Sequence, residues 1–226
     1  MSIVLAPMRT FAILPIKNLD HAKQRLAAGV GPLPRRALVE AMFADTLVAL
    51  RRSTALSGVV VVSSDSRAQR IAEGYGATVV QDSESGHSEA AMLGVELATE
   101  RGAERVLLVP ADCPLIDAGE LDRLATWPTP ERGVLVVPDR HGLGTNALLL
   151  QPPDVIAPAF GDGSHARHLS SARAAGVAAE TVKLGSLSLD IDTPEDLAAA
   201  EQALADSRGG AAHTRGMLMQ LMRSRA

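Results

Sequence analysis

Short apolar runs alternate with alanine- and leucine-rich segments along most of this chain, and this alternation restricts its fold more than any other feature. The runs are largely β-branched, as is typical of strands buried on both faces. They lie at Thr10–Ile16, Gly58–Ser63, Thr78–Gln81, Arg105–Pro110 and Val134–Pro138. Segments with helical spacing lie between them, at Arg35–Arg52, Arg67–Tyr75, Ser88–Arg101 and Ala118–Thr126. The pattern predicts an α/β fold in which crossover helices cover a mostly parallel sheet.

The second part of the chain has a different rhythm. Further strands are predicted at Gly144–Leu150 and Val177–Leu184, with a helix at Gly163–Ala175 between them. A chain of 226 residues with 46% hydrophobic content can bury its core as one domain, and we assign residues 1–206 to it. Residues 207–226 are rich in glycine and alanine and then place methionine and leucine among arginines, so we expect a flexible tail, frayed or bound to a partner.

Charge and cysteine content exclude several classes of protein. The 22 basic and 26 acidic residues give a net charge of −4, which argues against nucleic acids and anionic membranes as partners and favours small molecules. The single cysteine, Cys113, allows no internal disulfide and no cysteine-cluster zinc site. There is no signal-peptide pattern, and no apolar run reaches the roughly 18 residues of a spanning helix. We therefore expect a cytoplasmic protein.

Three cations follow the first predicted strand within one short connection, Lys17, Lys23 and Arg25. Such groups can hold a triphosphate and neutralise the charge that develops during phosphoryl or nucleotidyl transfer. The alternative is a solvated basic loop without a ligand. A Walker-type glycine loop is absent from the sequence, which disfavours a P-loop NTPase.

Acidic residues occur where two predicted strands end. Asp112 follows the strand at Arg105–Pro110 and lies between two prolines in Val109-Pro-Ala-Asp-Cys-Pro-Leu115. Asp190 and Asp192 alternate with apolar residues in Leu187-Ser-Leu-Asp-Ile-Asp-Thr-Pro-Glu-Asp-Leu197, so a strand here would point both to one face. Carboxylates at neighbouring strand ends can hold Mg²⁺ together with substrate phosphates, and open parallel sheets bind ligands at that edge. The alternative for Asp112 is a turn or helix cap.

The Asp192-Thr193-Pro194 sequence also predicts where a helix begins. Thr193 is a suitable N-cap and Pro194 a suitable first helical residue. Glu195 and Asp196 are then acids of the first turn that favour the helix dipole, so we do not assign them to the metal.

A glycine-rich stretch in the second part of the chain is suited to a second anion. Its glycines allow close backbone approach, and Thr145, Ser164 and the amides that open the helix at Ser164 can bind a phosphate or carboxylate. The glycines are Gly142, Gly144, Gly161 and Gly163, and the nearby donors are Arg140, His165, Arg167 and His168. For the two histidines we expect hydrogen-bonding or structural roles rather than a metal site.

Taken together and in this order, the motifs resemble the CofC/FbiD guanylyltransferases over roughly residues 10 to 205. They are the loop from Pro15-Ile-Lys17 to Ala22-Lys-Gln-Arg-Leu26, Pro110-Ala-Asp-Cys-Pro-Leu115, Gly144-Thr-Asn-Ala-Leu148, Phe160-Gly-x-Gly-Ser164 and Leu189-Asp-Ile-Asp-Thr-Pro-Glu-Asp196. The resemblance implies a single three-layer α/β/α domain with a mostly parallel, Rossmann-like sheet of the MobA-like, nucleotide-diphospho-sugar transferase type. Residues 10–138 would form its nucleotide-binding half and residues 139–206 its acceptor and metal half.

The same resemblance implies an activity and a set of ligands. GMP would pass from GTP to phosphoenolpyruvate or 2-phospho-L-lactate with Mg²⁺, in an early step of coenzyme F-420 biosynthesis, and the product would go to a downstream transferase. We favour phosphoenolpyruvate. The acceptor site maps onto Thr145, Gly161 and Ser164, and nucleotide contacts map onto Lys17, Lys23, Arg25, Gly86 and Ser88. The chain departs from its relatives at Ser88, where they often have asparagine, and at Cys113, where leucine is usual. We expect a monomer or homodimer.

Three other functions remain open from the sequence. Another MobA-like nucleotidyltransferase, such as a molybdopterin guanylyltransferase or a cytidylyltransferase, would usually begin with a Gly-x-Gly loop that this chain lacks. A non-catalytic nucleotide-binding protein is disfavoured by the intact set of Asp112, Asp190 and Asp192. A metal-dependent glycosyltransferase would place an Asp-x-Asp element where Asp112 is followed by Cys113 and Pro114.

Overall fold

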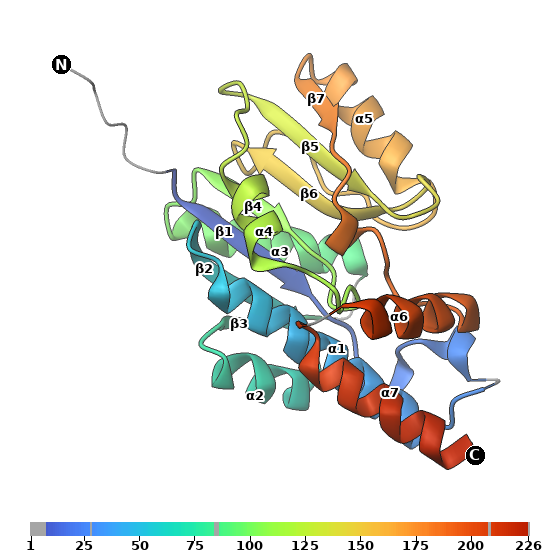
Figure 1. Ribbon diagram of the computed structural model, residues 1–226. Coiled ribbons are helices and arrows are strands. Elements are labelled where there is room, and N and C mark those ends of the chain that lie inside the picture. Colours follow the sequence, from blue (N-terminus) through green and yellow to red (C-terminus); the bar gives the residue numbers. More distant parts are fainter. Residues whose placement is uncertain (1–7, 28, 84–85, 208, 226) are drawn as a thin grey trace.

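The computed structural model describes residues 8–27, 29–83, 86–207 and 209–225. Its described strands form one sheet in the order β3-β2-β1-β4-β6-β5-β7 (Figure 1). They are β1 (Thr10–Pro15), β2 (Leu56–Ser63), β3 (Thr78–Gln81), β4 (Arg105–Leu108), β5 (Gly133–Pro138), β6 (Thr145–Gln151) and β7 (Ala178–Thr181). Strand β6 runs antiparallel to β4 and β5, and the other neighbouring strands are parallel. The predicted mostly parallel sheet is confirmed.

Helices cover both faces of this sheet, giving three layers (Figure 1). Helices α3 (His87–Glu100) and α5 (Ser164–Ala174) pack on one face, where β1 contributes Phe11 and Ile13. On the other face β1 contributes Ala12 and Leu14, because successive residues of a strand point to opposite sides. The helices on that face are α1 (Pro32–Arg52), α2 (Ser66–Gly74), α4 (Ala118–Ala125), α6 (Pro194–Asp206) and α7 (Ala212–Arg225).

The start of α6 confirms the helix signal in the sequence. The Thr193 side chain accepts a hydrogen bond from the Asp196 amide, and the Asp196 carboxylate accepts one from the Thr193 amide. This capping box satisfies two amides that would otherwise lack a partner. With Pro194 in the first turn, it fixes the direction in which the chain leaves Asp192.

The segment before that cap corrects one prediction. Residues 187–193 do not form a strand. A short 3-10 helix, η3 (Gly185–Leu187), is followed by irregular backbone that is fixed by a hydrogen bond from the Ile191 amide to the Asp112 carbonyl, 3.1 Å long. Asp190 and Asp192 are therefore positioned by a loop and not by the alternation of a strand.

The C-terminal residues correct a second prediction. Residues 212–225 form α7, which lies along α1 in Figure 1, so they are not a flexible tail. Leu218 and Leu221 are buried in the core, and Asp45 of α1 accepts hydrogen bonds from the amides of His213 and Thr214 at 3.1 and 2.7 Å. A carboxylate from another helix thus caps the start of α7.

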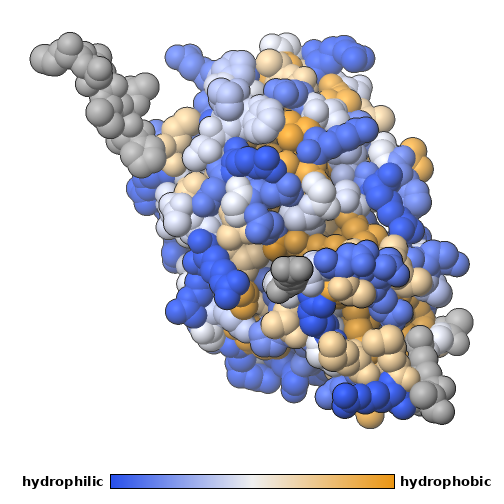
Figure 2. Space-filling view, in the orientation of Figure 1, coloured by the Kyte–Doolittle hydropathy of each residue, from blue (hydrophilic) through white to orange (hydrophobic). Residues whose placement is uncertain are grey.

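The outer surface of α7 remains partly apolar. Met219 and Met222 are about half exposed, and Leu33 of α1 is 80% exposed. In Figure 2 hydrophobic surface gathers in the lower part of the view, where α1, α6 and α7 lie. Within the described residues, no helix is long and apolar enough to cross a membrane.

Candidate active site

A cavity of about 900 Å³ opens at the edge of the sheet where β1, β4 and β5 end and β6 begins. Parallel strands and the helices that follow them leave such a crevice at their carboxyl ends. Among the predicted site residues, those that line this cavity are Lys17, Lys23, Arg25, Gly86, Asp112, Thr145, Gly161, Ser164, Asp190 and Asp192. Residues from both halves of the chain therefore surround one space.

Lys23 is at the centre of the charged part of the cavity. Its ammonium nitrogen lies 2.5 Å from Oδ1 of Asp192 and also contacts Oδ2 of Asp112. The side chain is only 9% exposed. Burial opposes the charge, but the neighbouring carboxylates of Asp112 and Asp192 outweigh it and hold the pKa of Lys23 above its ordinary value. Lys23 is thus a permanently charged group between two carboxylates.

The backbone at Lys23 has an unusual conformation. With φ 55° and ψ 43° it is left-handed, which few residues other than glycine adopt. The loop before Lys23 is held by two side chains: Asn18 accepts a hydrogen bond from the Asp20 amide, and Asp65 accepts one from the Leu19 amide. Strain that is maintained by its surroundings is common at functional sites. Here it directs the lysine to the carboxylates.

The carboxylates are suited to a divalent cation in part. Oδ1 of Asp112 is buried and has no hydrogen-bond partner, which leaves an acceptor available for a cation. Mg²⁺ in nucleotide enzymes is usually held by one or two carboxylates plus substrate phosphates, so Asp112 and Asp192 fit it. Among the described residues, however, no three His, Cys, Asp or Glu side chains are grouped closely enough to hold a metal ion. The three predicted ligands do not form a ready-made site.

Asp190 differs from the other two acids. The Asn146 side chain donates to its Oδ1 at 3.1 Å and to the Leu187 carbonyl at 2.8 Å. Burial, with the charge of Asp112 beside it, raises the pKa of Asp190 above its ordinary value. The side chain of Asp190 is therefore oriented by β6, through Asn146, as well as lining the cavity.

The remaining cations lie nearer the solvent. Lys17 and Arg25 are exposed where they line the cavity. The three cations of the connection after β1 therefore differ in their surroundings. Lys23 pairs with carboxylates, and Lys17 and Arg25 are available to an anionic ligand.

Ser88 corrects the predicted nucleotide contacts. It does not line the cavity, and its hydroxyl accepts a hydrogen bond from the Phe160 amide at 3.1 Å. Gly86 does line the cavity and has φ 138°, where a side chain would be strained. A Cβ on Gly86 would also meet the Glu89 carboxylate at 2.3 Å. Of the two predicted residues, only Gly86 faces the ligand space.

The part of the cavity predicted to bind the acceptor is built on a tight turn after β5. Asp139 accepts hydrogen bonds from the amides of His141, Leu143 and Gly144 at 2.9 to 3.0 Å. A Cβ on Gly144 would lie 2.7 Å from the Asp139 carboxylate, so a larger residue there would displace the group that holds the turn. This turn delivers Thr145 to the cavity at the start of β6, opposite the first turn of α5, where Ser164 lies.

The expected donors around this turn are largely occupied. Arg140 forms an ion pair of 2.5 Å with Asp196, and Arg167 donates to the carbonyls of Ala159 and Phe160. His165 bonds to the Gly142 carbonyl and the Thr181 hydroxyl. These side chains shape the loops and do not themselves line the cavity.

Four residues that line or support the cavity were not identified from the sequence. Asp82 is buried at the end of β3, and its Oδ1 has no hydrogen-bond partner. Burial lowers the pKa of His87, and Phe160 lies edge-on to its ring at 5.1 Å. The fourth is Asn146. Asp82 carries the same signal as Asp112, an acid directly after a predicted strand. Asn146 and Phe160 lie within the motifs Gly144-Thr-Asn-Ala-Leu148 and Phe160-Gly-x-Gly-Ser164, whereas His87 has no signal without the fold.

Comparison with known proteins finds matches over most of the chain. The family model described as "Guanylyl transferase CofC like" matches residues 10–219. A phosphoenolpyruvate guanylyltransferase of Conexibacter woesei is 52% identical over 96% of this chain and 98% of that protein. Another, from Sphaerobacter thermophilus, is 43% identical over 84% and 91%. A solved structure from Desulfovibrio desulfuricans, described as a nucleotide-diphospho-sugar transferase, has a TM-score of 0.75 at 16% identity and covers 96% of this chain and 98% of its own.

More distant relatives are named for other acids. A 3-phospho-D-glycerate guanylyltransferase of Colwellia psychrerythraea is 33% identical over 84% of this chain and 90% of that protein. A 2-phospho-L-lactate guanylyltransferase of Methanothermobacter thermautotrophicus is 31% identical over 84% and 83%. The names of these four guanylyltransferases each include a small phosphorylated three-carbon acid.

Proposed function

Because the chain belongs to the family of CofC-like guanylyl transferases, we propose that it transfers GMP from GTP to phosphoenolpyruvate and releases pyrophosphate. One observation of the structure supports this proposal above the others. A single cavity is lined by the cations that follow β1 and by the carboxylates of Asp112 and Asp192. The same cavity is lined by Thr145 and Ser164, where an anionic acceptor can bind. Donor and acceptor phosphates can therefore meet within one space.

Phosphoenolpyruvate is the acceptor that the relatives support best. The relatives at 52% and 43% identity carry that name, whereas those named for 3-phospho-D-glycerate and 2-phospho-L-lactate are 33% and 31% identical. 2-Phospho-L-lactate remains the second candidate. The two acids share a carboxylate and a phosphate, and they differ in planarity at the central carbon, which hydroxyl donors such as Thr145 would sense only weakly.

The reaction needs positioning and charge neutralisation more than proton removal. A phosphate monoester is largely ionised near neutral pH, its second pKa being about 6. Its oxygen attacks the α-phosphorus of GTP in line, the bond from that phosphorus to the β-phosphate oxygen breaks, and the electron pair leaves with pyrophosphate. No general base is required.

The residues of the chain take distinct roles in this step. Lys17 and Arg25 bind the triphosphate, and Lys23 offsets the charge that develops on the transferred group. Asp112 and Asp192 would hold Mg²⁺, which when bound supplies positive charge to the phosphate oxygens. Lys23 then exchanges a carboxylate partner for a phosphate. With Asp112 and Asp192 as partners, its pKa lies above the ordinary value and the ammonium is charged.

The product would be a mixed diphosphate of guanosine and the acid. Such an activated ester suits a downstream transferase that moves the phosphorylated acid to an alcohol and releases GMP, as expected for coenzyme F-420 biosynthesis. We propose that the protein acts in the cytoplasm as a monomer or homodimer, with no nucleic acid or membrane partner.

Pyrophosphate release by purified protein tests the proposal. The assay contains Mg²⁺ and GTP with phosphoenolpyruvate, 2-phospho-L-lactate, 3-phospho-D-glycerate or no acid, and each other nucleoside triphosphate replaces GTP as a control. We expect release that requires GTP and is fastest with phosphoenolpyruvate. A preference for another acid would correct the substrate. No release with any acid, although GTP binds in calorimetry, would refute guanylyl transfer to this class of acceptor.

A further inference from the structure

The loop between residues 159 and 163 lines the end of the cavity near Thr145 and Ser164, and hydrogen bonds from several side chains hold it. The Phe160 amide donates to Ser88 of α3, and Arg167 of α5 donates to the carbonyls of Ala159 and Phe160. The Ala159 amide donates to Nε2 of His168 at 2.9 Å. Phe160 also lies edge-on to the His168 ring, with 5.3 Å between ring centroids. The loop is therefore tied to both helices on this face of the sheet.

His168 connects this loop to the acceptor site. The residue is completely buried, and its Nδ1 lies 3.0 Å from Oγ1 of Thr145. A backbone amide can only donate, so the contact with Ala159 requires a lone pair on Nε2. In the neutral imidazole the proton must then be on Nδ1. Nδ1–H donates to the Thr145 hydroxyl oxygen.

This polarity decides what Thr145 can do. A hydroxyl has one proton to donate and two lone pairs to accept with. Since Nδ1–H occupies a lone pair, the hydroxyl proton is free to point elsewhere. Thr145 lines the cavity, where an anionic ligand requires donors. If the opposite tautomer were present, the hydroxyl would instead donate to the histidine.

We propose that His168 is a positioning residue: by accepting from Ala159 and donating to Thr145, it keeps the Thr145 hydroxyl as a donor to the phosphate or carboxylate of the acceptor. The inference rests on the proposed function for the identity of that acid. It goes beyond that function because it assigns specificity for an anion to His168, whose side chain does not line the cavity.

The charge state of His168 agrees with this role. Burial, followed by the positive charge of Arg167 and then the neighbouring His165, lowers the pKa of His168 to about 4. The ring is neutral at physiological pH, as the lone pair on Nε2 requires. An imidazolium would place a proton against the Ala159 amide.

A double-mutant cycle separates positioning from simple structural support. Thr145→Val removes the hydroxyl at nearly constant volume, and His168→Phe removes both ring nitrogens. We expect each to raise KM for phosphoenolpyruvate about tenfold, the effect of losing a hydrogen bond to a charged group, with KM for GTP changed less than about twofold. The double variant should be no worse than Thr145→Val, because both changes remove one interaction. Independent, multiplying effects would overturn the proposal.

Two further variants serve as a rescue test and as a control. His168→Asn places an amide N–H near the position of Nδ1 and should recover part of the lost acceptor affinity, which a purely structural role would not give. His213→Phe is the matched control, since His213 is a histidine of α7 whose ring contacts Tyr75 far from the cavity. It should leave both KM values unchanged. Melting temperatures of all variants show whether each one folds.

The tautomer itself can be measured without any turnover. Long-range ¹H–¹⁵N correlation spectra of the ¹⁵N-labelled protein, assigned with His168→Asn, should show Nδ1 protonated and Nε2 unprotonated. A proton on Nε2 would refute the inference. If the wild-type protein does not turn over GTP, the proposed function is refuted but the role of His168 is not. The spectra, with calorimetric binding of phosphoenolpyruvate to wild type and Thr145→Val, still decide the role of His168.

Discussion

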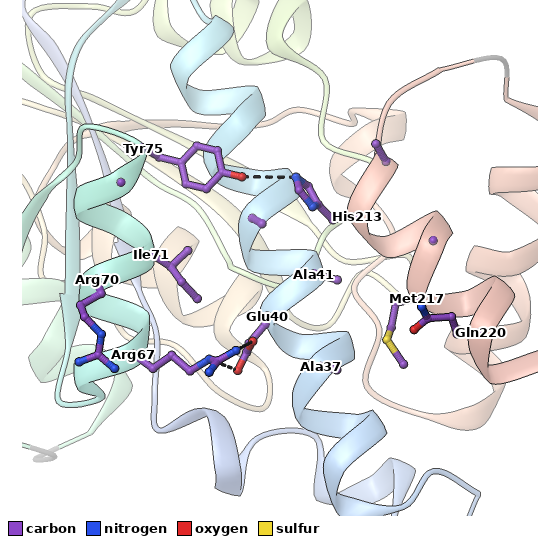
Figure 3. Close-up of a pocket in the computed structure, with 14 residues that line it drawn as sticks. Ala37, Glu40, Ala41, Arg67, Arg70, Ile71, Tyr75, His213, Met217 and Gln220 are labelled. Atoms are coloured by element: carbon purple, nitrogen blue, oxygen red, sulfur yellow. Dashed lines mark hydrogen bonds and ion pairs between the residues drawn. The ribbon is translucent and has the colours of Figure 1, made fainter. Parts of the chain in front are cut away.

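The active-site cavity and the groove between α1, α2 and α7 have similar volumes, about 900 and 740 Å³, but opposite chemistry. In the groove, polar side chains satisfy one another: Arg67 forms an ion pair of 2.6 Å with Glu40, and the Tyr75 hydroxyl lies 3.3 Å from His213 (Figure 3). In the cavity, Oδ1 atoms of Asp82 and Asp112 are buried without partners. Thr214 of α7 also has a buried hydroxyl without a partner, but its side chain lines neither space. Buried carboxylate oxygens without partners, and not volume, therefore distinguish the cavity from the groove.

The backbone reinforces the contrast. The loops around the cavity contain the left-handed Lys23 and several glycines with positive φ, among them Gly86 and Gly161. The groove is formed by the regular helices α1, α2 and α7, and its lining mixes alanine and glycine with long polar side chains. Substitutions in the cavity should therefore alter turnover, and substitutions around the groove should alter stability alone.

The largest expected effect tests the cavity. Asp112→Asn removes the charge that would hold Mg²⁺ without changing the size of the side chain. We expect turnover in the pyrophosphate assay to fall by at least about a hundredfold. Asp117→Asn is the matched control, since Asp117 caps α4 from the same segment and asparagine can replace it. Ordinary activity of Asp112→Asn at normal Mg²⁺ concentrations would show that this carboxylate holds no metal.

A second test concerns the position shared by Lys23 and the cation. Lys23→Met leaves Asp112 and Asp192 without their ammonium partner, so Mg²⁺ should stabilise this variant more than wild type. The difference should be on the order of 2 kcal/mol at a hundredfold excess over Kd. Thermal unfolding with EDTA and with Mg²⁺ measures it. Equal shifts for both proteins would mean that the ammonium and the metal do not share this site.

On the groove side, α7 should contribute to stability and not to activity. Leu218→Ala removes a buried side chain of α7 and should lower the free energy of unfolding by about 2–5 kcal/mol, as measured by urea denaturation. Met219→Ala, at a half-exposed position of the same helix, should have little effect. Kinetic constants of Leu218→Ala below its unfolding transition should equal those of wild type. A change in them would connect α7 to the active site.

The stability of the protein should depend on pH through His168, next to the proposed acceptor site. The pKa of His168 is about 4 in the folded protein and ordinarily 6.5, so between these values the unfolded chain binds more protons. Stability due to this group is therefore present above about pH 6.5 and is lost as the pH falls toward 4. Wild type should lose up to about 3 kcal/mol relative to His168→Phe across this window. Parallel pH profiles of the two proteins would contradict the buried neutral state.

The smallest effect is expected within the groove. Glu40→Gln breaks the ion pairs with Arg67 and Arg36, whose side chains are 53% and 31% exposed. Because solvent screens such a pair, unfolding free energy should change by less than about 1 kcal/mol and turnover should not change. A large kinetic effect of this substitution would contradict the division between cavity and groove.

Much of this architecture could be predicted from local patterns. The alternation of β-branched and alanine-rich segments gave the strands and the crossover helices nearly to their ends, because burial on both faces imposes a continuous apolar run. Asp112 was identifiable because it follows such a run, and Thr193-Pro194 because caps act within one turn. These signals depend on neighbours in sequence.

Other features have no local signal. The apolar residues of α7 are few and lie among arginines, and its first amides are capped by Asp45, more than 160 residues earlier in the chain. Asp190 and Asp192 looked like strand residues because they alternate with apolar ones. The backbone there is instead fixed by a hydrogen bond to Asp112. Such contacts cannot be read from spacing.

The sequence by itself determined the order of strands and helices from β1 to β7, the strand-end position of Asp112 and the helix start at Thr193, since each follows from propensities within a few residues. Only the tertiary structure decided that Lys23 lies between Asp112 and Asp192, which are 89 and 169 residues away, and that His168 directs the hydroxyl of Thr145. These arrangements depend on long-range packing. The free energy of each charge or hydrogen bond is set by the groups that the fold places beside it.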